Sequence, residues 1–156
     1  MKAFHFTLEA VRTLRQRNEQ KALERYAQAL LTRQRAMEKL DAAQRELDRN
    51  TAALTTAFQT GSTALKIAQI NDYQRVLTVR RDEAAKMLGD AERLLNAAHQ
   101  AMIAARQQRE IVDKFFDKQK AHHHRELAQN EQKMLDDLAG RRNNSLFTWN
   151  PTPHSS

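Results

Sequence analysis

Apolar residues in the second half of the chain recur with the spacing of a coiled coil. Starting at Leu77 and stepping by four and three residues in turn, ten of twelve positions are apolar, over more than five heptads. The twelve positions are Leu77, Arg81, Ala84, Leu88, Ala91, Leu95, Ala98, Met102, Ala105, Arg109, Val112 and Phe116. A repeat sustained over this length predicts a long helix that packs against another helix along one seam.

The first half of the chain has a second, looser seam. Polar residues interrupt it at Arg33, Gln44 and Thr51. Its positions are Leu23, Tyr26, Leu30, Arg33, Met37, Leu40, Gln44, Leu47, Thr51, Leu54 and Phe58. The two seams together predict two long helices, with a chain reversal between them.

The only plausible reversal between the seams lies at Gln59–Thr63. Gly61 can adopt the left-handed conformation that ends a helix, and Ser62 or Thr63 can cap the next one. Asn71 and Asp72 offer a second possible cap, so the second helix starts between about Thr63 and Asp72. We therefore expect a turn over about 60–64.

A reversal near residue 62 requires that facing residues have numbers adding to about 125. Leu23 then faces Met102, Leu30 faces Leu95 and Met37 faces Leu88, while Gln44 falls opposite Arg81 in a polar layer. Two independently found seams thus match in register, which predicts an all-α fold: one antiparallel coiled-coil hairpin. We expect a single domain over 1–142 with helices over about 4–59 and 65–139, followed by a disordered tail over 143–156.

The second helix is predicted to outlast the first. Residues from about Arg125 onward have no facing residue, yet Leu127, Met134 and Leu138 continue an apolar stripe. An isolated helix with an apolar stripe is marginal in water, so this overhang predicts a partner surface.

Composition and charge narrow the class further. The chain has 3 Gly, 2 Pro and 0 Cys in 156 residues, which argues against β-sheet folds, disulfide frameworks and thiolate metal sites. No apolar run is long enough for a membrane span or a secretory signal, so we expect a cytoplasmic protein. The net charge is +7, and residues 1–35 carry a local excess of five positive charges. Such a field can attract an acidic protein, anionic lipid or nucleic acid.

Few residues suggest chemistry. The consecutive residues His122, His123 and His124 would point about 100° apart on a helix, so we favour a solvated stretch over a metal site. We find no arrangement typical of catalysis and expect neither enzymatic activity nor a cofactor. Gly89, next to the seam, permits either a slight bend or a close approach, and the sequence does not choose between them.

Ile70, Tyr73 and Leu77 form an apolar stripe with i, i+3, i+7 spacing just after the reversal, and Val76 widens it. Two interpretations stay open: the stripe closes the core of the hairpin, or it is an exposed recognition patch.

Three segments resemble the flagellar export protein FliJ family. Phe6–Arg15 is similar to the family's F-x-L-x-x-V-L-x-L-R start, with Leu14 one place late. Ile70–Leu77 is similar to its I-x-x-Y-Q-x-x-L stretch, and Arg125–Ala139 resembles R-x4-E-Q-K-x-x-D-E-x-A, with Asp137 in place of Glu. The resemblance covers about 4–140.

This resemblance implies a non-enzymatic, coiled-coil stalk of the flagellar type III export apparatus, similar in shape to the stalk of F-type and V-type ATPases and needed for flagellum assembly and motility. The end with both termini would enter the pore of a hexameric export ATPase, and the bend would contact the cytoplasmic domain of the membrane export gate. Escort of export chaperones is also implied. The chain would then lie at the cytoplasmic face of the inner membrane.

The candidate contacts follow from this placement. The gate candidates are Ile70, Tyr73 and Leu77. The ATPase candidates are Arg12, Arg15, Leu127, Glu131, Lys133, Met134 and Leu138. Two alternatives remain: a stalk homologue of an injectisome, and a generic basic coiled-coil scaffold or nucleic-acid-binding protein. We expect no nucleic acid partner, because the aromatic residues lie mostly on the seams and offer no stacking platform.

Overall fold

Two long helices make up most of the protein. The computed structural model describes residues 3–147, with α1 at Glu9–Thr60 and α2 at Ala64–Phe147. The chain divides into two compact units: the hairpin unit, Leu14–Arg109, and the terminal unit, which combines residues up to Thr13 with residues from Glu110 onward. The all-α prediction is confirmed, and each unit is described separately below.

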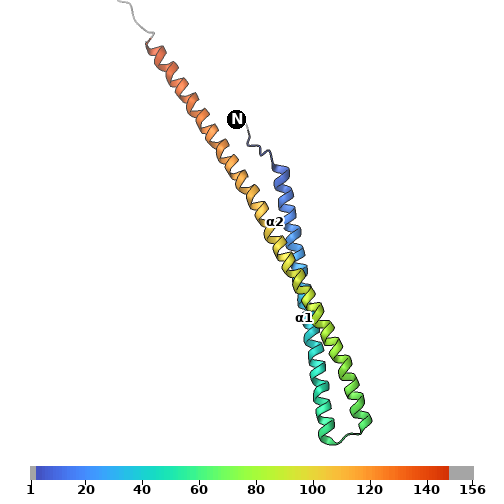
Figure 1. The fold of residues 1–156 in the computed structure, drawn as a ribbon. Helices are drawn as coiled ribbons and strands as arrows, with labels where there is room; N and C mark the ends of the chain where they lie inside the picture. The colour runs from blue at the N-terminus through green and yellow to red at the C-terminus, as the bar shows by residue number, and fades with distance from the viewer. Residues whose placement is uncertain (1–2, 148–156) are drawn as a thin grey trace, which may run out of the picture. The chain divides into compact units, whose positions relative to one another are not determined.

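The turn of the hairpin unit forms where the sequence predicted it. Gly61 has a φ of +72°, and the Ser62 amide donates a hydrogen bond of 3.0 Å to the Ala57 carbonyl. This is the Schellman arrangement, which glycine adopts without steric cost. The Thr63 hydroxyl accepts a 3.4 Å hydrogen bond from the Lys66 amide, so Thr63 caps α2 and the alternative start at Asn71 is wrong. Figure 1 shows α1 and α2 leaving this turn side by side.

The seam predicted for α2 agrees with the buried face of that helix. In the hairpin unit its positions are buried or half-buried, and Leu77 and Ala91 are the most enclosed. The seam predicted for α1 is only half right. Tyr26, Leu40 and Leu47 belong to it, but at every second position the more buried face includes the residue one place before the predicted one.

The shifted positions of α1 are mostly alanine. Ala22, Ala36 and Ala57 are 9%, 7% and 5% exposed, while their neighbours Leu23, Met37 and Phe58 are 41%, 39% and 65% exposed. Seam residues whose numbers add to 124 then face each other, and this places Ala22 opposite Met102, Ala29 opposite Leu95 and Ala36 opposite Leu88. A small residue opposite a large one lets the two helices approach closely, which explains why the larger neighbours lie outside.

Contacts beside the seam agree with the predicted register of about 125 to within one residue of the value of 124 for the seam itself. The Tyr26 and His99 rings lie 5.5 Å apart, Arg33 pairs with Glu92 at 3.7 Å, and the residue numbers in both pairs add to 125. The predicted polar layer between Gln44 and Arg81 does not form a hydrogen bond. Gln44 donates to Asp48 on its own helix, and Arg81 donates to Asp82.

A different polar layer lies nearer the turn. The Asn50 amide donates hydrogen bonds of 2.6 Å to the Gln74 side chain and 3.1 Å to the Ile70 carbonyl. The Gln74 amide in turn donates to the Thr51 hydroxyl at 2.8 Å. These bonds satisfy half-buried amides across the two helices, and such a layer fixes the register of a coiled coil.

The terminal unit is built around aromatic rings instead of alanines. Phe6 is 4% exposed, and its ring packs edge-on against Phe116 with ring centres 5.1 Å apart. Phe4 contacts the same ring at 5.4 Å. Helix α1 begins at Glu9, not at the predicted residue 4, because residues 3–6 are non-helical and carry these rings onto α2.

Helix α2 continues further than predicted. It ends at Phe147, so 143–147 of the predicted disordered tail are helical, since neither Gly nor Pro interrupts them. The rest of that tail lies outside the described residues. From residue 128 to residue 147 every side chain is exposed, as expected for an overhang without a facing helix. No helix within 3–147 has a stretch long and apolar enough to cross a bilayer.

Candidate partner-binding surfaces

The overhang of α2 carries an exposed apolar stripe. The stripe residues from residue 134 onward are Met134, Leu135, Leu138 and Leu146, which are 65%, 61%, 59% and 69% exposed. Leu127, half-buried, begins the stripe. At about 100° per residue, these five positions fall within an arc of about 120°. We call these five residues the terminal stripe. Leu135 and Leu146 were missed by the sequence analysis because they do not follow its steps of seven and four.

Two charged residues lie within the same arc. Glu131 and Arg142 fall between the leucines by the same rotation, and neither makes an ion pair that the structure records among the described residues. Lys133 is rotated about 160° from the centre of the stripe. Of the predicted ATPase contacts, Glu131, Met134 and Leu138 therefore share one exposed face with Leu127 at its inner end, whereas Lys133 points away from it.

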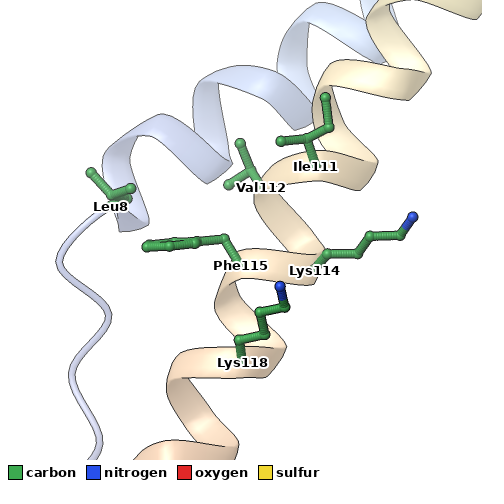
Figure 2. A pocket seen from close by; sticks show the side chains of 6 residues that line it. All are labelled: Leu8, Ile111, Val112, Lys114, Phe115 and Lys118. Carbon is green, nitrogen blue, oxygen red and sulfur yellow. The ribbon is translucent and has the colours of Figure 1, made fainter.

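A second surface of the terminal unit is a groove of about 420 Å³ on α2 beside the start of α1. Figure 2 shows the Phe115 ring directed toward the start of α1, where Leu8 lies, and Lys114 and Lys118 also line the groove. Leu8 and Phe115 are 39% and 44% exposed. No pattern in the sequence predicted this groove, although the motif that begins at Phe6 contains Leu8.

Arg12 has a structural role in the terminal unit. Its Nε donates a 3.2 Å hydrogen bond to Asp113 Oδ1, and its guanidinium lies 4.0 Å from the centre of the Phe116 ring. Both the ion pair and the cation–π contact occupy the guanidinium within the chain. The Arg12 side chain is still 27% exposed, and its assignment to the ATPase contact surface stays a prediction.

Arg15, in the hairpin unit, is also half-buried. Its guanidinium donates a 2.8 Å hydrogen bond to the Gln108 side chain, and nearby Arg109 forms an ion pair with Glu19. Asp113 on α2 thus compensates the charge of Arg12, whereas in the Arg109–Glu19 pair the base lies on α2 and the acid on α1. Arg15 therefore has a hydrogen-bond partner within the chain, and its assignment to the ATPase contact surface stays a prediction.

The three consecutive histidines do not converge. His123 packs against Phe4 with ring centres 5.5 Å apart, while His122 Nε2 lies 3.0 Å from Glu126 Oε1 on the same helix. Among the described residues, no group of three potential ligands is arranged to hold a metal ion.

Near the turn of the hairpin unit, the predicted stripe divides between core and surface. Leu77 is 1% exposed and lies on the seam, so it cannot contact a partner while the hairpin is packed. Ile70 is half-buried, and Tyr73 is 42% exposed. Of the two interpretations left open, core closure holds for Leu77 and exposure holds for Tyr73.

The exposed surface near the turn follows a different face of α2. Leu65, Tyr73 and Val76 are 71%, 42% and 47% exposed, and the helical rotation places all three within about 80°. We call these three residues the bend patch. Leu77 lies at the edge of this face and also on the seam. The predicted stripe of Ile70, Tyr73 and Leu77 therefore contains both a core residue and a surface residue.

A hydrogen bond across the two helices orients the Tyr73 ring. Its hydroxyl donates to Glu46 Oε1 at 2.9 Å. This hydrogen bond and the negative charge of Glu46 favour the neutral phenol and raise the pKa of Tyr73, and Arg80 acts in the opposite direction. The ring is thus held in one orientation with part of its surface in solvent.

Gly89 makes no close approach, because a Cβ built there would meet nothing within 4 Å. The close-approach interpretation of this glycine is therefore wrong.

Comparison with protein families identifies the chain. The family model described as "Flagellar FliJ protein" matches residues 4–145, which includes α1 and nearly all of α2. Searches of curated proteins and of solved structures gave no significant match. The matched range contains the Phe6 motif, the bend patch and most of the terminal stripe. The chain therefore belongs to the FliJ family, the non-enzymatic components of the flagellar export apparatus.

Proposed function

We propose that this chain is a coupling stalk of the flagellar export apparatus, which links the hexameric export ATPase to the cytoplasmic domain of the membrane export gate. The terminal stripe binds the ATPase, and the bend patch binds the gate. This places the chain at the cytoplasmic face of the inner membrane. ATP and its hydrolysis belong to the partner, and the chain contributes two binding surfaces that share one helix.

The observation that carries the proposal is the exposed stripe on α2 inside the range matched by the family. Met134, Leu135 and Leu138 are each about 60% exposed over consecutive turns. Exposed apolar side chains clustered on one face of a helix are typical of a helix that binds in a groove of a partner. The match to the flagellar family supports a flagellar role over an injectisome role.

Two surfaces on one helix support coupling. Helix α2 contributes the terminal stripe to the terminal unit and the bend patch to the hairpin unit. A partner that binds the terminal stripe therefore contacts the same helix as a partner that binds the bend patch.

The test is a crossed binding experiment with the full chain. The variant Met134→Gln/Leu138→Gln should lose ATPase binding at least tenfold and keep gate binding, whereas Tyr73→Ala/Val76→Ala should do the reverse. Leu94→Gln and Val79→Ala are matched controls, since these residues are 64% and 55% exposed in the hairpin unit but outside both surfaces. Binding of both partners at wild-type strength by both double variants would refute the proposal.

Leu77 is left out of the gate variant because of its burial. Its replacement would weaken the hairpin core and so reduce binding without revealing a contact. Circular dichroism of each variant confirms that the helices are intact before binding is compared.

A further inference from the structure

The terminal stripe is complementary to itself in the antiparallel direction. If two copies of α2 pair so that facing residue numbers add to 273, Leu127 faces Leu146 and Leu135 faces Leu138. The same register places Glu131 opposite Arg142. Each of these contacts occurs twice, because a two-fold axis makes residue i meet j and j meet i.

The charges make this register specific. Glu131 and Arg142 are both exposed and lie within the apolar arc, so each would leave a charge inside a purely apolar partner groove. In the self-paired register, each charge meets its opposite. We propose that a second copy of this chain pairs with the terminal stripe, antiparallel, over residues 127–146.

The contact is short, so the dimer is weak. Residues 127–146 span about 30 Å at 1.5 Å per residue, which gives an interface below the size of stable dimers. We expect a dissociation constant in the micromolar range. Because the stripe is the one assigned above to the ATPase, self-pairing and ATPase binding exclude each other. The inference itself rests on the stripe alone, and its test needs no partner, so its failure leaves the proposed function standing.

Charge reversal tests the register directly. Sedimentation equilibrium of the purified chain should show a monomer–dimer equilibrium, and Glu131→Arg or Arg142→Glu alone should each weaken it at least tenfold. Mixed in equal amounts, the two variants should dimerise again, since every pair across that interface then joins Arg with Glu. Leu94→Gln, on the hairpin unit, should leave the equilibrium unchanged.

The direction of pairing has its own measurement. The chain has 0 Cys, so Ala128→Cys gives a single site for a spin label. The antiparallel register separates the two labels by 17 residues along the helix axis, or about 26 Å, whereas parallel pairing brings them within about 10 Å. A wild-type chain that stays monomeric through the micromolar range overturns the proposal and leaves the stripe to a different partner. The proposal is also overturned if the mixture of the two charge variants does not dimerise, or if the distance between the two spin labels is about 10 Å.

Discussion

The hairpin unit and the terminal unit bury apolar surface in different ways. The hairpin unit pairs alanines on one helix with large side chains on the other, as Ala36 and Leu88 illustrate, and leaves its larger neighbours half outside. The terminal unit buries Phe6 against Phe116 and leaves a run of leucines exposed. A seam of small residues lets two helices pack closely, and this packing depends on the register between them. An aromatic cluster fixes a short non-helical segment and leaves the remainder of α2 available for partners.

The largest expected effect is on the aromatic cluster. Phe6→Ala should cost about 3–5 kcal/mol of stability in the terminal unit, because it removes a buried ring and leaves a cavity beside Phe116. Hydrogen exchange should show the loss of protection near residues 110–120, while the amides of the hairpin unit keep theirs. Phe58→Ala is the control, since Phe58 is 65% exposed and its replacement should change stability by less than about 1 kcal/mol. Equal losses for the two variants would contradict the assignment of Phe6 as the anchor of this unit.

The alanine seam can be tested with a pair of neighbours. Ala36→Leu should destabilise the hairpin unit by about 1–3 kcal/mol, because the site opposite Leu88 has room only for a small side chain. Met37→Ala should cost less than about 1 kcal/mol, since Met37 is 39% exposed and alanine favours helix. Urea unfolding followed by circular dichroism measures both. If Met37→Ala were the costlier change, the seam would follow the larger residues after all.

These neighbours show what the sequence could and could not predict. The α2 seam from Leu77 was predictable because its large residues keep strict heptad spacing. The α1 seam offered an alanine and a larger residue side by side at Ala22/Leu23, Ala29/Leu30 and Ala36/Met37, and hydrophobicity alone favours the larger one. The alanines are selected only by the requirement that a large residue on one helix face a small residue on the other. That requirement can be applied only when the sequences of both helices are considered together.

The exposed residues divide in the same way. The exposure of Met134 and Leu138 was predictable, because α1 leaves no residues to face them. The contacts of Arg12 and Arg15 could not be predicted, because Asp113 and Gln108 are distant in sequence and adjacent in the fold. Leu77 was included among the candidate gate contacts because its position fits both the heptad spacing of the seam and the spacing of the stripe with Ile70 and Tyr73.

Two glycines of the hairpin unit should respond with opposite signs. Gly89→Ala should raise the free energy of unfolding by about 1 kcal/mol, because Gly89 is helical and has open space around its missing Cβ. Gly61→Ala should lower it by about 1–2 kcal/mol, because the φ of +72° is strained for a residue with a Cβ. Thermal unfolding of both variants measures the difference. A loss of stability in Gly89→Ala would indicate a contact at this position that depends on glycine.

The smallest effect concerns the bend patch and its orientation. In a Tyr26→Phe background Tyr73 is the sole tyrosine, since the chain has 2 Tyr. Its pKa should lie above the value of about 10 of a free tyrosine, because Glu46 accepts its hydrogen bond and repels the phenolate. The folded-state pKa is raised, so the contribution of this hydrogen bond is complete below pH about 10 and is lost as pH rises through the raised value. Ultraviolet titration of the phenol measures it. Glu46→Gln should lower this pKa and Arg80→Gln should raise it; an unchanged titration in Glu46→Gln would mean that the ring is not held by Glu46 in solution.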